Sequence, residues 1–204
     1  MKNIIKDALI LFIITAAAGI MLAVVNEVTR KPIEEGKRAA VEAACREVFP
    51  EAAGFEDNGL PADEHEAYSD FKTRYPKDSV DEIYKALGTD GEVVGVVLNM
   101  TNKEGYGGNI RFSMGISSDG TLKGVSILET AETPGLGLQA EDVLLPQFKD
   151  RRADKFVYVK GGGADAEDEV DAISSATITT RAFTNGINAG LDFYRTVIKA
   201  ASMP

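Results

Sequence analysis

The chain has 204 residues, of which 44% are hydrophobic and 26% are charged, a composition typical of a globular protein rather than a disordered one. Its net charge of −10 is uneven: residues 1–31 carry +2, so the remainder carries −12 and would be repelled by nucleic acid. A single cysteine, Cys45, and a single histidine, His65, exclude an internal disulfide, a cysteine-held iron–sulfur cluster and the usual zinc-ligand sets. We therefore expect no metal site and no nucleic-acid partner.

The amino-terminal segment 1–31 is predicted to be a membrane anchor. Residues 8–26 contain no charged side chain and are apolar all round. At about 1.5 Å per residue this run spans about 28 Å, close to the hydrocarbon thickness of a bilayer. A single transmembrane helix over residues 8–26 in contact with membrane lipid is the favoured interpretation.

Two other interpretations of this segment are open. A cleaved signal peptide would explain the basic start and the small residues 16–18, but the apolar run continues past them to Val25. A buried core helix is the second alternative. For an anchor, the short amino-terminal flank is expected in the cytoplasm, which places residues 27–204 outside the cell membrane. Basic residues after the span, such as Arg30 and Lys31, weigh against this orientation.

Residues 32–89 are interpreted as a helical and loop lead-in. Pro32 stands at a plausible first helical position, and apolar residues follow it at helical spacing as far as Val48. Cys45 lies near this apolar stripe, which favours a small buried residue over a reactive thiol. Residues 50–79 are polar and acidic and are expected to form loops with short elements, with His65 in solvent.

From residue 90 the hydrophobic period changes to two. Residues 92–101 and 109–117 are predicted strands, a turn at 118–120 leads to a return strand, and residues 155–160 form another short strand. Apolar residues from Phe183 to Ile198 then recur on one face of a helix. The fold class expected for residues 90–204 is α+β, an antiparallel sheet with helices packed on it.

Two glycine-bearing segments follow strands in this region. Gly105–Gly108 is either a plain hairpin connection or a close approach to a flat ligand on which Tyr106 stacks. The stretch Glu132–Gly137, with its Pro-Gly turn signature, is equally a turn or a cofactor loop whose amides face a ring or an anion.

The stretch DAISSATITT, residues 171–180, precedes the last helix and is crowded with hydroxyl groups. Ser174 or Ser175 is a suitable helix cap, but one cap does not explain the other hydroxyls. A helix start also has free amides and a positive dipole end, which suit a phosphate. A threonine in the first turn is placed to bind that phosphate or to be esterified by it.

These motifs resemble a known family. DAISSATITT resembles the D-x-x-S/T-G-A-T motif of proteins that carry FMN on threonine through a phosphoester, with Ser175 at the position that is usually glycine. The ETPGLG segment and the Gly105-Tyr106-Gly107 turn are further marks of that flavin domain. With the anchor, the chain resembles the G subunits of Rnf ion-translocating ferredoxin:NAD oxidoreductases. The C subunits of sodium-pumping NADH:quinone reductases are related.

The resemblance implies a set of site residues. Thr177 would carry FMN, esterified by a dedicated flavin transferase, and Asp171 would serve transferase recognition or fix the turn. Residues of the two motifs and of the turn would surround the cofactor: Ser174, Ser175, Ala176, Glu132, Thr133, Pro134, Gly135, Leu136, Gly137, Tyr106 and Gly107.

The resemblance also implies a function. The chain would relay electrons through the flavin between neighbouring iron–sulfur and flavin subunits of a membrane complex, with no catalytic residue beyond the flavin. Two alternatives stay open: another flavinylated extracytoplasmic carrier, including the quinone-reductase type, and a membrane-tethered binding module without redox function.

Overall fold

The computed structural model describes residues 2–59, 66–133, 135 and 137–201. The chain divides into two compact units, Met1–Ala40 and Val41–Pro204, which are described separately below. His65, predicted to lie in solvent, falls outside the described residues.

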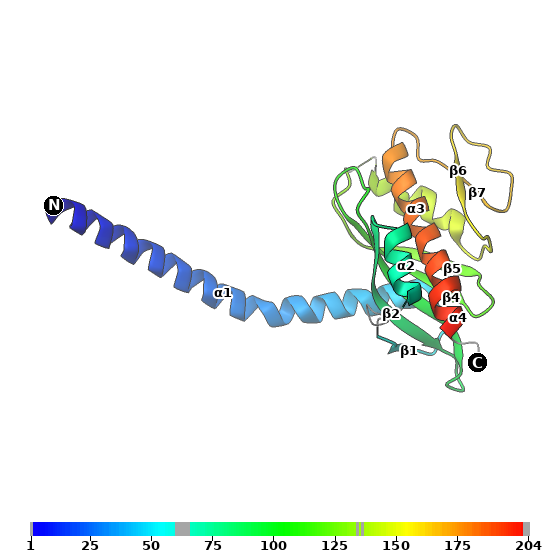
Figure 1. The fold of residues 1–204 in the computed structure, drawn as a ribbon, viewed down its shortest axis with the longest axis horizontal. Coiled ribbons are helices and arrows are strands. Elements are labelled where there is room, and N and C mark those ends of the chain that lie inside the picture. Colours follow the sequence, from blue (N-terminus) through cyan, green and yellow to red (C-terminus); the bar gives the residue numbers. More distant parts are fainter. Residues whose placement is uncertain (1, 60–65, 134, 136, 202–204) are drawn as a thin grey trace. The chain divides into compact units, whose positions relative to one another are not determined.

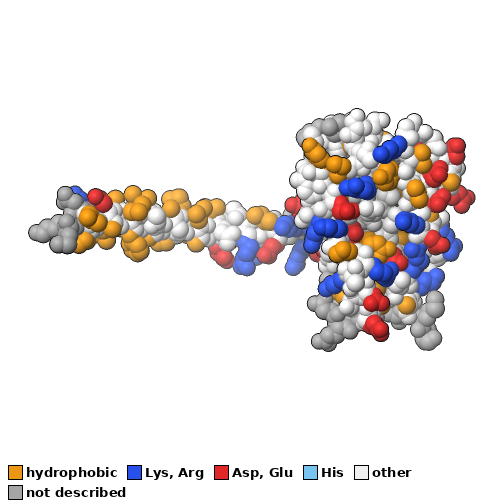
Figure 2. Space-filling model, turned by 45° about the horizontal axis from the view of Figure 1, so that its top comes forward, with side chains coloured by type: hydrophobic (Ala, Val, Ile, Leu, Met, Phe, Trp, Pro, Cys, Tyr) orange, Lys and Arg blue, Asp and Glu red, His pale blue; other side chains and the backbone are white. Residues whose placement is uncertain are grey.

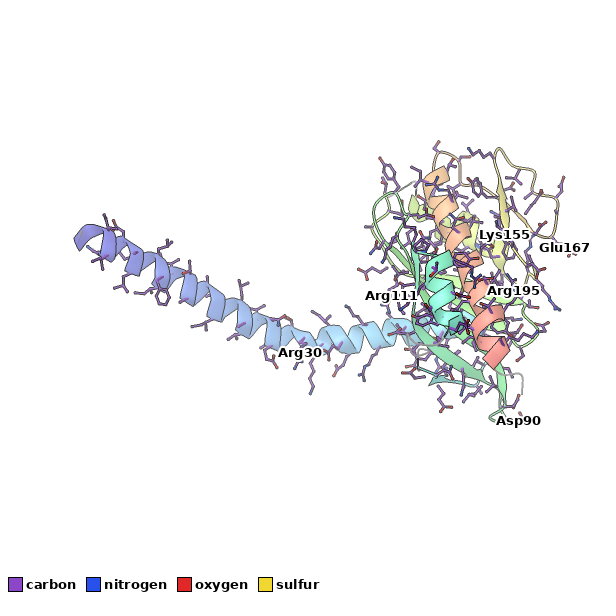
Figure 3. All side chains as sticks on the ribbon, viewed as in Figure 1. Arg30, Asp90, Arg111, Lys155, Glu167 and Arg195 are labelled. Carbon is purple, nitrogen blue, oxygen red and sulfur yellow. The ribbon has the colours of Figure 1, made fainter. Side chains whose placement is uncertain are left out.

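The first unit is helical. It belongs to one continuous helix, α1, which covers Lys2–Val48. Pro32 therefore lies inside the helix, and its predicted place at a helix start is wrong. Figure 3 shows a bend beside Arg30, two residues before the proline, in accord with the backbone bond that a proline ring removes.

The apolar side chains of this first unit are exposed. Figure 2 shows hydrophobic side chains around the amino-terminal part of α1 and charged ones farther along it. The most apolar 18-residue stretch of α1 has no buried residue, so the interpretation of this segment as a buried core helix is wrong. Among the described residues, α1 is the one helix long and apolar enough to cross a membrane.

A five-stranded antiparallel sheet forms the centre of the second unit, with the strands in sequence order (Figure 1). The strands are β1 (Gly54–Asp57), β2 (Asp78–Leu87), β3 (Val93–Asn102), β4 (Ile110–Ser117) and β5 (Leu122–Thr130). The predicted common face of β4 is confirmed, because Ile110, Phe112, Met114 and Ile116 all belong to the main hydrophobic core, whereas Gly115 faces Val48.

Strand β2 was not predicted. A register shift between Val80 and Glu82 places Val80 and Ile83, three positions apart, on the same buried face, while Ala86 is buried on the other face. A β-bulge of this kind hides the period of two on which strand prediction depends. Because β2 pairs with β3, the expected boundary between residues 89 and 90 falls inside the sheet. Asp90 marks the turn between these strands in Figure 3.

Helix α3 (Thr177–Phe193) packs on one face of the sheet, against β3 and β4. Gly186 and Gly190 permit this approach: a Cβ would lie 2.9 Å from the Phe112 ring at Gly186 and 2.2 Å from the Met114 sulfur at Gly190. Helix α2 (Glu66–Arg74) lies beside α3 (Figure 1), where the Phe71 and Phe193 rings are 5.0 Å apart. The predicted carboxyl-terminal helix is confirmed, and a π-helical turn, Tyr194–Ile198, and α4, Lys199–Ala201, extend it.

The opposite face of the sheet receives the last turns of α1. Cys45, Val48 and Phe49 are buried there with Ala86 and Val97. Three glycines on adjacent strands make room for them: a Cβ would lie 2.6 Å from the Phe49 ring at Gly95, 2.5 Å from the Val48 carbonyl at Gly115 and 3.3 Å from the Val48 Cα at Gly124. Burial raises the pKa of the Cys45 thiol to about 11, with Glu82 and Glu42 adding to the effect. The prediction of a small buried cysteine is confirmed.

A small lobe connects the sheet to α3. Short 3₁₀ and π-helical turns cover Gly137–Gln139, Ala140–Leu144 and Leu145–Phe148, and two short parallel strands follow, β6 (Val157–Val159) and β7 (Glu169–Asp171). The Arg151 guanidinium holds this lobe by donating to the carbonyls of Gln147, Glu169, Ala166 and Glu167. The chain thus leaves β7 directly into the hydroxyl-rich stretch before α3.

Candidate functional site

A cavity of about 450 Å³ lies where three chain segments meet. The segments are the loop between β3 and β4, the loop after β5, and the first turn of α3. Its described lining residues are Tyr106, Glu132, Thr133, Gly137, Ser175, Ala176, Thr177, Ile178 and Thr179. The volume falls within the range of about 300–1,000 Å³ that is usual for small-molecule and cofactor sites. The sheet therefore brings together the three motifs that are separated in the sequence.

Helix α3 begins without a side-chain cap. Its cap residue is Ala176, whose side chain makes no capping bond, and Thr177 is the first helical residue. The expectation that Ser174 or Ser175 caps the helix is wrong. Ser175 instead adopts a φ of +65°, the left-handed conformation that turns the chain into the helix. Glycine adopts this conformation without steric cost, which explains why the family motif that this stretch resembles usually has glycine here.

The uncapped start leaves the cavity wall with the features of an anion site. The first-turn amides of an α-helix have no partner within the helix, and the helix dipole places positive potential there. Here Ala176, Thr177 and Ile178 line the cavity at that helix end. The geometry suits the phosphate of a nucleotide-type cofactor.

The threonine hydroxyls of the stretch differ in their bonding. Thr179 Oγ1 donates to Glu132 Oε2 at 2.8 Å. Thr180 Oγ1 donates to the Ala176 carbonyl at 3.0 Å and accepts from the Ile173 amide at 3.1 Å. Within the described residues the half-buried Thr177 hydroxyl has no hydrogen-bond partner. Thr177 is therefore the threonine of this turn whose hydroxyl is free at the cavity.

Glu132 is the buried carboxylate of the site, with 5% of its surface exposed. Oε2 accepts from Thr179, and Oε1 accepts from the Gly107 amide at a longer 3.4 Å. The Glu132 amide in turn donates to Thr130 Oγ1 at 3.2 Å. The residue thus connects all three segments around the cavity.

The other predicted residues divide into those at the cavity and those outside it. Tyr106 lies on the rim with 70% of its surface exposed, and Thr133 and Gly137 line the wall. Gly107 touches the site through its amide, and Gly135 is exposed with a φ of +77°. Pro134 and Leu136 lie outside the described residues.

Asp171 and Ser174 do not line the cavity. The Asp171 carboxylate accepts from the Ala164 amide at 3.0 Å and so fixes the lobe before the motif. Ser174 is exposed on the connection between β7 and α3. Their places suit a role in shaping or presenting the turn rather than in contacting the cavity contents.

Sequence reasoning missed Ile178 and Thr179 as cavity-lining residues. The first turn of a helix presents consecutive residues to a ligand at its end, so a predicted helix start at Thr177 would have included both. The partnership of Thr179 with Glu132 has no signal in the sequence, because the residues are 47 positions apart.

Comparison with known proteins identifies the domain. Residues 105–192 match the family model of the FMN-binding domain, and residues 1–48 match that of the RnfG N-terminal region. NqrC from Shewanella oneidensis has the same fold, with a TM-score of 0.62 at 18% identity over 83% of this chain and 100% of that chain. Residues 105–192, which include β4, β5 and the start of α3, thus form an FMN-binding domain.

Full-length relatives identify the family. The G subunit of the Na⁺-translocating ferredoxin:NAD⁺ oxidoreductase complex of Acetobacterium woodii is 37% identical over 97% of this chain and 95% of its own length. The G subunit of an ion-translocating oxidoreductase complex from Methanosarcina acetivorans is 31% identical over 94% and 95%. The chain belongs to this family of Rnf-type G subunits. Together with the apolar amino-terminal helix, this membership supports a membrane protein.

Proposed function

We propose that this chain is a membrane-anchored electron-relay subunit of an ion-translocating ferredoxin:NAD oxidoreductase complex and carries FMN esterified to Thr177. The family membership and the match to the FMN-binding domain support the relay function. One observation carries the attachment site: Thr177 presents a hydroxyl that no described residue bonds, in the first turn of an uncapped helix and on the wall of the cavity.

The residues present fit FMN. The amides at the start of α3 would bind the phosphate, and Thr133, Gly137 and Tyr106 would lie along the ring system. When bound, the flavin supplies the electron-transfer chemistry, and the protein supplies its position and electrostatic surroundings. The cavity has no described histidine or cysteine in its lining that would act as an alternative redox or acid–base group.

A phosphoester also suits the expected location. We place the FMN domain outside the cytoplasm, with the amino terminus inside and α1 in contact with lipid. A flavin lost there would be diluted, whereas an ester does not dissociate. A flavin transferase is then a maturation partner, and the electron donors and acceptors are the iron–sulfur and flavin subunits of the same complex.

Co-expression with a flavin transferase tests the attachment. The denatured full-length chain should show in-gel flavin fluorescence and a mass gain of one FMN less one water, and peptide mapping should assign the gain to Thr177. Thr177→Ala should lose both signals. Ser174→Ala and Ser175→Ala remove neighbouring hydroxyls and should keep them. Fluorescence that persists in Thr177→Ala would overturn the attachment site.

The same preparations separate the other candidate functions. A colourless wild-type chain with no mass gain would favour the binding module without redox function. Co-purified partner subunits would distinguish the ferredoxin:NAD type of complex from the quinone-reductase type. Reporter enzymes fused to the carboxyl terminus, active on one side of the membrane only, would test the orientation.

A further inference from the structure

We propose that the Glu132 carboxylate is the positioning residue of the flavin site, and that its charge lowers the reduction potential of the flavin bound beside it. The second half of this inference rests on the proposed function. The first half concerns the protein without its cofactor and stands on the contacts of the described residues.

The positioning role follows from the segments that Glu132 joins. Oε1 accepts from the Gly107 amide in the loop between β3 and β4, and Oε2 accepts from Thr179 in the first turn of α3. Glu132 itself belongs to the loop after β5. All three segments contribute to the cavity lining. Among the described residues, Glu132 has the one side chain that bonds to two of these segments besides its own.

The surrounding glycines are matched to this carboxylate. A Cβ at Gly105 would lie 2.8 Å from Oε1, and a Cβ at Gly137 would lie 2.4 Å from Oε2. At Gly107 a Cβ would lie 2.0 Å from the Ala131 carbonyl, directly before Glu132. A side chain at Gly105 or Gly137 would push against the carboxylate, and one at Gly107 would push against the backbone next to Glu132. The segments close around Glu132 because these three positions have no side chain.

The charge argument begins with the donors. Each carboxylate oxygen has a hydrogen-bond donor beside it, the Gly107 amide at Oε1 and the Thr179 hydroxyl at Oε2, so a negative charge at this position is satisfied on both oxygens. Glu132 is the one charged residue among the described residues that line the cavity, and no described lysine or arginine forms an ion pair with it. The positive end of α3 offsets its charge only in part.

A fixed negative charge on a partly dry wall opposes the arrival of an electron. The Coulomb energy between two charges grows as their separation and the effective dielectric decrease. A cofactor in the cavity would lie close to this carboxylate, and the effective dielectric at a cavity wall is lower than in bulk water. The reduced flavin is therefore disfavoured relative to the oxidised one. Removal of the charge should shift the reduction equilibrium toward the reduced flavin on the order of tenfold.

The positioning half is tested on the full-length chain without flavin, by hydrogen–deuterium exchange. Glu132→Ala should speed exchange about tenfold at the Gly107 amide, which donates to Glu132, and at the Thr180 amide, which closes the first turn of α3 onto Ala176. A tenfold change is the effect of losing a hydrogen bond worth about 1.4 kcal/mol. Glu132→Gln, which keeps the shape and an acceptor, should change it less. Glu129→Ala, an exposed carboxylate on β5, is the matched control. Unchanged exchange in Glu132→Ala would overturn the positioning role.

The charge half is tested on the flavin-loaded chain by spectroelectrochemical titration. Glu132→Gln should raise the midpoint potential, while Glu129→Gln, the same charge change at an exposed site, should not. Thr179→Val removes a donor but keeps the carboxylate, and its potential should not rise. Equal potentials for wild type and Glu132→Gln would overturn the charge role. A wild-type chain that takes up no flavin would overturn the proposed function and with it the charge role, while the exchange experiment still decides positioning.

Discussion

The two ends of strands β3, β4 and β5 use glycine in the same way and for different purposes. At one end Gly95, Gly115 and Gly124 leave room for Val48 and Phe49. At the other end Gly105, Gly107 and Gly137 leave room for Glu132 and for the backbone next to it. In both places a Cβ would collide with a neighbouring segment, so glycine alone does not indicate a binding site.

The two ends differ in what fills the cleared space. At the α1 end the cleared space is filled by an apolar cluster in which every residue is buried: Cys45, Val48, Phe49, Ala86 and Val97. At the other end a buried carboxylate occupies part of it and a cavity remains. Close packing indicates a stability role, and an open cavity with a buried charge indicates a functional one.

The largest effect on stability is expected from Gly115→Ala. Its Cβ would lie 2.5 Å from the Val48 carbonyl oxygen, a backbone atom that cannot rotate away. Overpacking of this kind costs about 1–3 kcal/mol, and the strand must move or the last turns of α1 must detach. Urea unfolding of the full-length chain in detergent measures the loss. Gly54→Ala on β1, where a Cβ has nothing within 4 Å, is the matched control and should be close to neutral.

A smaller loss of stability and a large loss of flavin are expected from Gly107→Ala. Its Cβ would lie 2.0 Å from the Ala131 carbonyl, so the loop must withdraw from Glu132. Destabilisation of about 1 kcal/mol is expected because the loop is exposed and free to shift. Flavin content per folded chain should fall severalfold, as read from in-gel fluorescence. Normal flavin content in this variant, or an equal loss in Gly115→Ala, would break the distinction between the two ends.

The packed end also predicts an inert thiol. The pKa of Cys45 is raised by burial from 9.0 to about 11, so at pH 8 its thiolate fraction is about a hundredfold lower than in the unfolded chain. Alkylation of the native protein should be slower by at least that factor and should become fast in urea. The stability that this group contributes is complete below pH 9 and is lost as the pH rises through about 11. Rapid native labelling would show that the last turns of α1 leave the sheet.

The smallest effect is expected at Ser175, whose φ of +65° costs an L-residue about 1–2 kcal/mol. Ser175→Gly relieves this strain but adds freedom to the unfolded chain, so the net gain should be at most about 1 kcal/mol. Flavin content should be retained. Ser174→Gly, at a neighbouring position without a positive φ, should destabilise by about 0.5–1 kcal/mol. Thermal unfolding of both variants should therefore show stability changes of opposite sign.

Much of the fold was predictable because it depends on local patterns. The uncharged run at residues 8–26 lies within a helix, the alternation of β4 forms a buried strand face, and the apolar stripe from Phe183 packs against the sheet. Strand β2 was missed because its bulge changes the spacing of buried residues from two to three. Pro32 was misplaced because a proline within a long helix bends it and need not end it.

The candidate site was predictable as a set of segments and not as an arrangement. The motifs at residues 105–107, 132–137 and 171–177 pointed to one cofactor, and the cavity gathers residues from each of them. The prediction that a serine caps α3 failed, because the left-handed turn at Ser175 places Ala176 at the cap position. A cap is chosen by backbone geometry, which residue preferences describe only on average.

Local patterns in the sequence are enough to indicate most elements of this protein: an apolar helix, alternating strands, a hydroxyl-rich helix start and two glycine-bearing loops. Which hydroxyls are already bonded depends on the folded chain: Thr179 and Thr180 are paired, while Thr177 has no partner among the described residues. The fold also buries Glu132 between Gly105, 27 residues before it, and Gly137, five residues after it. The physical reason is that these contacts depend on antiparallel register and on close approach of backbones, which join residues far apart in the chain and leave no periodic signal in it.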